Sequence, residues 1–159
     1  MVREDVLALA LGRRGFSFIE LVVTIAIIAL ATAISMPSLL TYWRAATVRA
    51  AAEELVAGLN RGRQIAIARG RNVCVEVVDS QYRYRIPACA SDPWTGPGTS
   101  ADGFFTLANG VTLTKNANPV FDYLGTATPG AATFTVTHPQ GGATLKVVVS
   151  VSGRVQITH

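Results

Sequence analysis

One acidic residue, Glu20, lies within a long apolar stretch, where a charge is unfavourable unless it has a partner. Residues 16–36 read FSFIELVVTIAIIALATAISM, and 16 of these 21 residues are apolar. Glu20 carries the only charge in this run. A carboxylate inside an apolar membrane segment costs about 3 kcal/mol unless it finds a partner, so such a residue marks function by default. The alternative is that Glu20 lies near the membrane interface and is tolerated there.

Other residue types that support catalysis or metal binding do not form a constellation. Neither His138 nor His159 is spaced with a serine or cysteine as in a nucleophile motif. No group of histidine, cysteine and acidic residues has the spacing of a metal site. The aspartates in the second half of the chain are scattered, at Asp92, Asp102 and Asp122. We therefore predict no enzyme activity, no metal and no cofactor.

The apolar run is long enough to cross a membrane. At about 1.5 Å per residue, a helix over residues 16–36 spans roughly 30 Å, which is the thickness of the hydrocarbon layer. A cleaved secretory signal would be shorter and would end in small residues. Arg13 and Arg14 precede the run, and the next lysine or arginine is Arg44, so we expect the N-terminus in the cytoplasm and the rest across the membrane.

The helical pattern continues beyond Pro37. Apolar residues recur at spacings of three, four and seven, at Val48, Ala51, Ala52, Leu55, Leu59 and Ala66. Gly58 and Gly62 weaken the helix locally, and Gly70 ends it. We predict one helix over residues 17–68, with residues 37–70 amphipathic.

From residue 72 the hydrophobic period changes from 3.6 to 2. Residues 73–78 and 82–86 predict a β-hairpin, and residues 87–103 have the composition of a loop. Further strands are predicted at 104–107, 111–115, 119–124, 132–138, 145–151 and 154–158, with a two-residue turn at Ser152 and Gly153 between the last two. The fold class is α+β: a long N-terminal helix, transmembrane and then amphipathic, packed on an antiparallel sheet formed within residues 71–159.

The chain contains two cysteines, Cys74 and Cys89. On the oxidising side of a membrane they can form one disulfide, worth about 3 kcal/mol in the loop-entropy model. The alternative is a buried Cys74 with an exposed, free Cys89. We favour the disulfide.

The residues around Glu20 resemble a known processing signal. The sequence Gly15-Phe16-Ser17-Phe18-Ile19-Glu20-Leu21, after a basic pair and before a long apolar run, is similar to the type III signal of type IV pilins and type II secretion pseudopilins. The resemblance implies that a prepilin peptidase cuts after Gly15, so that residues 1–15 are a leader peptide, and that Phe16 is then N-methylated. It also implies that Glu20 pairs with the new N-terminus of a neighbouring subunit, and that Pro37 is the proline at which the helix melts or kinks during assembly.

A second stretch resembles one branch of that superfamily. The sequence RAAAEELVAGLNRGRQIAIARGRNVCVEV is similar to the helix-to-strand passage of the GspH/FimT family, and residues 120–125 and 153–155 resemble its C-terminal elements. The resemblance implies a pilin-like fold and a minor pilin or pseudopilin. Its partners would be other pilins or pseudopilins, the prepilin peptidase and the inner membrane.

Arginines are concentrated in the middle of the chain. Residues 44–85 include eight arginines and four acidic residues, a net charge of +4, whereas the positive and negative charges after Arg85 are equal in number. Clustered cations can bind phosphate, and some members of the family bind DNA. The candidate anion or DNA contacts are Arg61, Arg63, Arg69, Arg71 and Arg154, although Gln156 replaces a second arginine of that family's C-terminal element. We favour the alternative, in which these arginines are a solvated helix face or make fibre contacts.

The composition agrees with a structural subunit. Half of the 159 residues are hydrophobic (50%) and only 15% are charged, which excludes a disordered or nucleic-acid-coating chain. We predict a single-pass inner-membrane protein with a periplasmic C-terminal domain, which primes or caps a type II secretion pseudopilus or a type IV pilus. The alternatives are a DNA-binding minor pilin for DNA uptake and an anchored periplasmic binding domain that never enters a fibre.

Overall fold

The computed structural model describes residues 16–107, 110–130 and 132–158. These residues form two units, one ending at Ser38 and the other beginning at Leu39. The predicted leader over residues 1–15, including the glycine of the processing signal, lies outside the described residues, and so does the C-terminal histidine.

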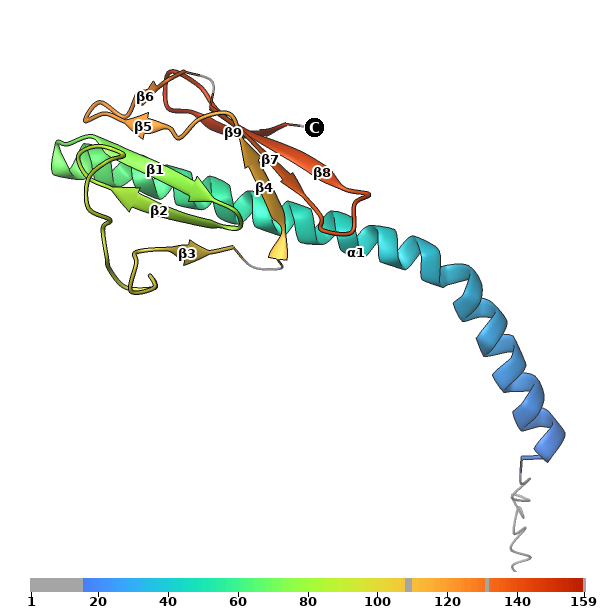
Figure 1. Cartoon of the computed structure of the whole chain (residues 1–159). Coiled ribbons are helices and arrows are strands. Elements are labelled where there is room, and N and C mark those ends of the chain that lie inside the picture. Colours follow the sequence, from blue (N-terminus) through green and yellow to red (C-terminus); the bar gives the residue numbers. More distant parts are fainter. Residues whose placement is uncertain (1–15, 108–109, 131, 159) are drawn as a thin grey trace, which may run out of the picture. The chain divides into compact units, whose positions relative to one another are not determined.

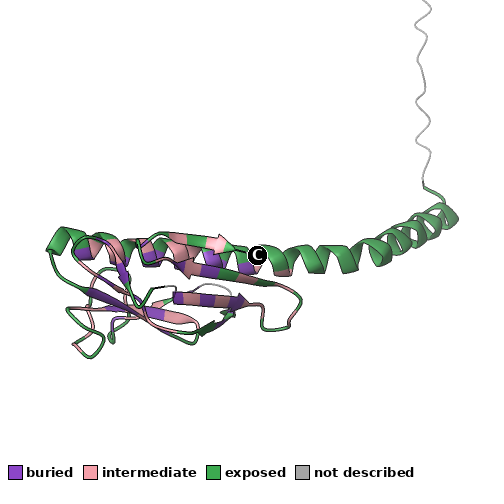
Figure 2. Ribbon diagram, turned by 90° about the horizontal axis from the view of Figure 1, so that it is seen from above, coloured by how far each residue is buried: buried purple, intermediate pink, exposed green. Residues whose placement is uncertain are grey.

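Helix α1 (Phe18–Arg69) runs through both units, close to the predicted range. In the first unit its residues are exposed on every side (Figure 2). The hydroxyl groups there donate to carbonyl groups one turn earlier: Thr24 Oγ1 to the carbonyl of Glu20 and Ser35 Oγ to that of Ala31, both at 2.9 Å. Such bonds satisfy polar side chains without water, as an apolar medium requires.

In the second unit α1 buries one stripe against the sheets. The stripe contains all six predicted residues together with Gly58 and Gly62: Val48, Ala51, Ala52, Leu55, Gly58, Leu59, Gly62 and Ala66. The two glycines have a role that the sequence pattern did not show. A Cβ atom on Gly58 would lie 2.6 Å from the Tyr82 ring, and one on Gly62 would lie 2.7 Å from Val75 Cγ2. They are therefore needed for the close approach of the helix and the sheet.

Helix α1 ends as predicted, at Gly70. The N–H of Gly70 donates to the carbonyl of Ile67, and the N–H of Arg71 donates to that of Ala66. This is the pattern of a Schellman motif, in which the residue after the helix takes a positive φ. Gly70 has φ 60°.

The strands form two antiparallel sheets on α1 (Figure 1). The first sheet has the order β3-β2-β1-β5-β6 and consists of β1 (Val73–Val78), β2 (Gln81–Arg85), β3 (Phe105–Thr106), β5 (Val120–Phe121) and β6 (Ala127–Thr128). The second has the order β4-β7-β8-β9 and consists of β4 (Thr112–Lys115), β7 (Ala132–Thr137), β8 (Thr144–Val149) and β9 (Val155–Thr158). The predicted fold class and the β1–β2 hairpin are confirmed, with two sheets in place of one.

The predicted strand over residues 119–124 is present only as β5, because a turn begins at Asp122. Asp122 Oδ1 accepts hydrogen bonds from the N–H groups of Leu124 and Thr126, and Oδ2 accepts one from Thr126 Oγ1. These bonds hold residues 122–126 in a turn, as aspartate side chains often do. The chain therefore reverses from β5 into β6 after two residues.

The connection between β8 and β9 is also longer than predicted. The N–H of Gly153 donates to the carbonyl of Ser150, and the N–H of Ser150 donates to the carbonyl of Arg154. Gly153 has φ 73°, so the loop is a turn followed by a glycine bulge rather than a two-residue turn. A Cβ atom on Gly153 would lie 1.9 Å from the carbonyl oxygen of Gly125, so the loop rests directly on the β5–β6 turn.

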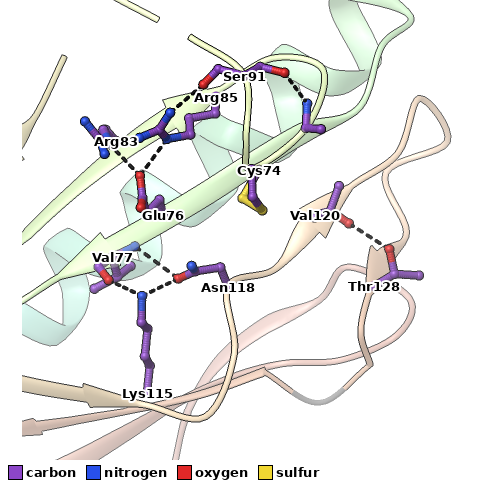
Figure 3. The surroundings of a disulfide bond; sticks show 12 residues. Cys74, Glu76, Val77, Arg83, Arg85, Ser91, Lys115, Asn118, Val120 and Thr128 are labelled. Carbon is purple, nitrogen blue, oxygen red and sulfur yellow. Dashed lines mark hydrogen bonds and ion pairs between the residues drawn. A yellow bond between two sulfur atoms is a disulfide. The ribbon is translucent and has the colours of Figure 1, made fainter. Parts of the chain in front are cut away.

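Two side chains join the sheets where strand pairing stops (Figure 3). Beyond its pairing with β5, strand β1 bonds through Val75 N–H to the carbonyl of Pro119. One step further, Asn118 Oδ1 accepts from Val77 N–H at 3.2 Å, and Lys115 Nζ, at the end of β4, donates to the carbonyl of Val77. Side chains thus satisfy the backbone of β1 where no strand lies beside it.

The contact between Gly153 and Gly125 gives a stability prediction. Gly153→Ala forces a Cβ atom into the Gly125 carbonyl, whereas Gly141→Ala, at φ 74° with nothing within 4 Å, places it in open space. We expect Gly141→Ala to lower the free energy of unfolding by about 1 kcal/mol, and Gly153→Ala to lower it by at least about 2 kcal/mol more. Urea unfolding of the full chain in detergent measures both. Equal losses would contradict the contact.

Candidate functional site

The predicted assembly residues of the first unit lie on an unburied helix. Phe16 and Phe18 are 79% and 81% exposed. Glu20 lies in the first turn of α1, where the positive end of the helix dipole favours a carboxylate. None of the ion pairs among the described residues involves Glu20. Pro37 lies inside α1 and has no N–H to donate to the carbonyl of Ala33.

Helix α1 is also the element that meets the length and composition of a membrane span, among the residues that the structure describes. An 18-residue window within it has a mean hydropathy of 2.4, and none of that window is buried. A core helix of a soluble protein would be buried. The exposed apolar surface of the first unit is therefore suited to a membrane or to packing with other apolar helices.

The structure does not bring the five predicted arginines to one surface. Arg61 and Arg69 lie on one face of α1 and both stack on Trp94, with 5.8 Å and 6.0 Å between each guanidinium carbon and the ring centroid. Arg61 also lies 5.2 Å from the centroid of Phe105. Arg71 is exposed just beyond the helix end. Arg61 and Arg69 thus form an arginine–aromatic cluster with Trp94 and Phe105.

Arg63 and Arg154 lie near the β8–β9 loop, away from the arginine–aromatic cluster. Residues 61 and 63 are about 200° apart around the helix. Arg63 Nη2 donates to the carbonyl of Ser152 at 3.4 Å, and a Cβ atom on Gly125 would lie 2.8 Å from Arg63 Nε. Arg154 is exposed at the start of β9, in the same loop as Ser152. Arg63 is therefore a packing residue of the β5–β6 and β8–β9 turns.

A partly buried ion-pair network lies on the β1–β2 hairpin (Figure 3). Arg83 Nε and Arg85 Nε donate to the same Glu76 oxygen at 2.6 Å and 2.7 Å. The sequence analysis missed this network, although the hairpin register, which sets Glu76 opposite Arg83, could have indicated it. Burial opposes ionisation of Glu76, but the hydrogen bonds and charges of both arginines outweigh it and hold the pKa of that carboxyl below its ordinary value.

The same arginines hold the long loop that follows the hairpin. Arg85 Nη1 donates to the carbonyl of Ser91, and the Arg83 guanidinium carbon lies 4.3 Å from the centroid of the Phe104 ring. The predicted disulfide is present: Cys74 and Cys89 are joined, with their Cα atoms 5.1 Å apart. Cys74 is fully buried in β1. The loop is therefore fixed to the hairpin at several points.

Among the described residues, the side chains that could bind a metal ion do not form a cluster. No group of three or more histidine, cysteine or acidic residues could hold a metal ion among them. His138 lies in the β7–β8 turn, where its Nδ1 accepts a hydrogen bond from the N–H of Gln140. An open groove of about 510 Å³ between α1 and the β7–β8 turn is lined by residues such as Tyr42, Ala46 and Leu145.

Family comparisons agree with these features. A family model described as type II transport protein GspH matches residues 51–153, which is more than half of the chain. A model described as the prokaryotic N-terminal methylation motif matches residues 10–36. No curated protein matches the chain.

Solved structures of the same fold include minor pilins and pseudopilins. The type IV minor pilin FimU of Pseudomonas aeruginosa strain PAO1 is 22% identical, with a TM-score of 0.53 over 70% of this chain and 92% of that one. GspH of E. coli is 17% identical, with a TM-score of 0.56 over 71% and 88%. The minor pseudopilin EpsH of the Vibrio cholerae type 2 secretion system is 14% identical, with a TM-score of 0.50 over 67% and 92%. At these identities the likeness shows the fold.

The Glu76 network predicts a pH-dependent contribution to stability. Because folding lowers the pKa of Glu76, its contribution is present above the ordinary value of 4.5 and is lost as pH falls through the lower folded value. We expect Glu76→Gln to lower the free energy of unfolding at pH 7 by about 1.5–3 kcal/mol, and the difference from wild type to shrink below about pH 4.5.

Urea unfolding between pH 7 and pH 3 measures this effect. Glu53→Gln is the matched control, because the Arg49–Glu53 pair has side chains 75% and 57% exposed. It should change stability by less than about 0.5 kcal/mol. A Glu76→Gln deficit that stays constant with pH would argue against the ionic network.

The disulfide gives a second stability prediction. Reduction should lower the free energy of unfolding of the wild-type chain by about 3 kcal/mol, because it frees the loop between Cys74 and Cys89 in the unfolded state. The Cys74→Ala/Cys89→Ala double variant should not respond to the reductant. Two reactive thiols in the folded, unreduced wild-type chain would show that the bond is absent.

Proposed function

The chain belongs to the GspH family of type II transport proteins, and on this premise we propose that it primes or caps the assembly of a type II secretion pseudopilus or a type IV pilus. The family consists of minor pilins and pseudopilins, which are structural subunits and assemble with other pilins. The family resemblance predicted from the sequence is confirmed.

The observation that carries the proposal is the unburied apolar helix with one carboxylate near its start. Residues 16–36 match the N-terminal methylation motif, and none of the helix in the first unit is buried. Such a surface is stable either in a bilayer or among similar helices. A subunit that leaves the membrane for a fibre uses both environments.

Glu20 would act when subunits join. Cleavage after Gly15 by the prepilin peptidase would leave an α-amino group on Phe16, and N-methylation would keep its charge. In a bundle of apolar helices this cation and a neighbouring subunit's Glu20 carboxylate would each be unfavourable alone. Their pairing offsets the cost of burial for both groups and selects one axial register between neighbouring helices.

Pro37 would give the helix a weak point at the end of the apolar run. It leaves the carbonyl of Ala33 without its helical donor, which lowers the cost of local unwinding. Fibre assembly requires the helices to pack at a spacing that differs from that in the membrane. A break at Pro37 would allow that adjustment without disturbing the residues from Leu39 onward.

The inner membrane and the periplasm are the proposed location. The apolar helix supplies a single membrane anchor, and the basic pair before it favours a cytoplasmic N-terminus. The Cys74–Cys89 disulfide supports an oxidising compartment for the globular unit.

DNA binding has less support. Arg61 and Arg69 stack on Trp94, and Arg63 packs under the β8–β9 loop, so these cations are not arranged along one open surface. An anchored binding domain that never enters a fibre would not need the processing signal around Gly15. We therefore rank both alternatives below assembly.

The proposal predicts processing followed by incorporation. Expressed with its prepilin peptidase, the full chain should lose residues 1–15 and gain one N-terminal methyl group, as intact-mass spectrometry would show. Glu20→Val should still be cleaved but should be depleted about tenfold or more from sheared fibres, since an unpaired buried α-amino group remains. Thr24→Val, one turn along the same helix, is the control and should assemble normally. A wild-type chain that stays uncleaved would instead favour the anchored binding domain.

A further inference from the structure

Exposed apolar side chains gather at one end of the globular unit. Among the described residues that follow Trp43 in the sequence, the exposed large apolar side chains are Ile67, Val78, Tyr123, Leu124 and Val151. Four of these five belong to segments that meet: the end of α1, the β5–β6 turn and the β8–β9 loop. Figure 1 shows the β5–β6 turn beside the C-terminal end of α1. We name Ile67, Tyr123, Leu124 and Val151 the terminal patch.

Main-chain contacts hold the terminal patch together. A Cβ atom on Gly125 would lie 2.9 Å from Ile67 Cδ1, which places the β5–β6 turn on the helix end. The carbonyl of Val151 accepts a hydrogen bond from Ala127 N–H at 2.9 Å, which ties the β8–β9 loop to β6. With the Gly125–Gly153 contact, these bonds fix the three segments before any partner binds. A preformed surface loses less entropy on binding.

Three of the four side chains in the terminal patch are more than half exposed to solvent. Tyr123, Leu124 and Val151 are 58%, 66% and 63% exposed, although the core beside them is fully buried. Clustered apolar exposure marks interaction sites, whereas single exposed apolar residues are ordinary. Tyrosine is also enriched among the residues that contribute most to protein interfaces.

The charge beside the patch is positive. Arg154 is exposed next to the β8–β9 loop, and the Arg63 guanidinium lies under Gly125 with one long hydrogen bond among the described residues. The Asp122 carboxylate accepts three hydrogen bonds within its own turn, from Leu124 and Thr126, and keeps one negative charge, which the charges of Arg63 and Arg154 together exceed. Arg63 packs within the patch, so the exposed Arg154 is the cation that a partner would meet, and such a partner would carry carboxylates beside an apolar centre.

We propose that the terminal patch is the docking surface for the globular domain of a neighbouring, non-identical pilin subunit that presents apolar side chains flanked by carboxylates. This rests on the proposed function as a fibre subunit. A second copy of this chain fits less well, because the chain carries a formal net charge of +4 and would meet the exposed Arg154 with a like-charged molecule. DNA also fits less well, because the centre of the patch is apolar rather than cationic.

Photo-crosslinking in fibre-forming host cells tests the proposal on the full chain. A photoreactive amino acid replaces Leu124 or Val151, and Val78 is the matched control, since it is an exposed apolar residue at the far end of β1. We expect both patch positions to give an adduct with another pilin-type chain, in at least about tenfold higher yield than Val78. Adducts with a copy of this chain, with DNA, or with nothing above the Val78 level would overturn the proposal.

A charge reversal tests the chemistry of the partner. Arg154→Glu should lower the adduct yield from Leu124 about tenfold, and exchange of the partner's nearest carboxylate residue for lysine should restore it. An unchanged yield would overturn the assignment of a carboxylate-flanked partner. Arg154 is exposed, so the variant should keep its disulfide and its thermal unfolding midpoint, which are measured in parallel.

The N-terminal mass of the same chains distinguishes a failure of the docking surface from a failure of the proposed function. Chains that are cleaved, methylated and recovered in fibres but give no patch adduct would refute the docking surface and leave the proposed function standing. Chains that are never processed would refute the proposed function, and the docking surface with it.

Discussion

The close packing of α1 on the two sheets is the interaction on which the rest of the globular unit depends. Gly58 and Gly62 allow the Tyr82 and Tyr84 rings to lie directly on the helix, and the Tyr84 hydroxyl donates to the carbonyl of Gly58 at 2.8 Å. Glycine costs helix stability at both positions, about 1 kcal/mol each relative to alanine. The burial of two aromatic rings offsets that cost. Because this face sets the rotation of the helix, it also determines that Arg61 lies against Trp94 and that Arg63 lies under the β8–β9 loop.

Around this packing, side-chain hydrogen bonds and ion pairs stabilise the sheets in addition to the pairing of their strands. Glu76 joins Arg83 and Arg85 across the hairpin, and Lys115 with Asn118 completes the hydrogen bonding of β1. Short strands such as β5 and β6 would be weak by themselves. The ion pairs, the disulfide and the glycine contacts hold their connecting loops in place, so an irregular domain keeps one defined surface.

That surface and the apolar helix share a physical property, since both expose apolar groups that an isolated soluble monomer would bury. Fibre subunits satisfy such groups by contacts with neighbours, and family membership places this chain among such subunits. The helix would provide a common contact among all subunits. The terminal patch would provide a contact selective for one neighbour, because its loops and charges differ from one pilin sequence to another.

The sequence by itself determined the features that depend on neighbours along the chain. Periodicity located α1 and its buried stripe, glycine located the helix end, alternation located the β1–β2 hairpin, and the residues around Glu20 identified the family. Only the tertiary structure ended β5 at Phe121 and began β6 at Ala127, separated Arg63 from Arg61, and assembled the terminal patch. The reason is that these features depend on contacts between residues far apart in the chain, such as Gly125 with Gly153 and Ile67, and local propensity carries no information about which distant segments meet.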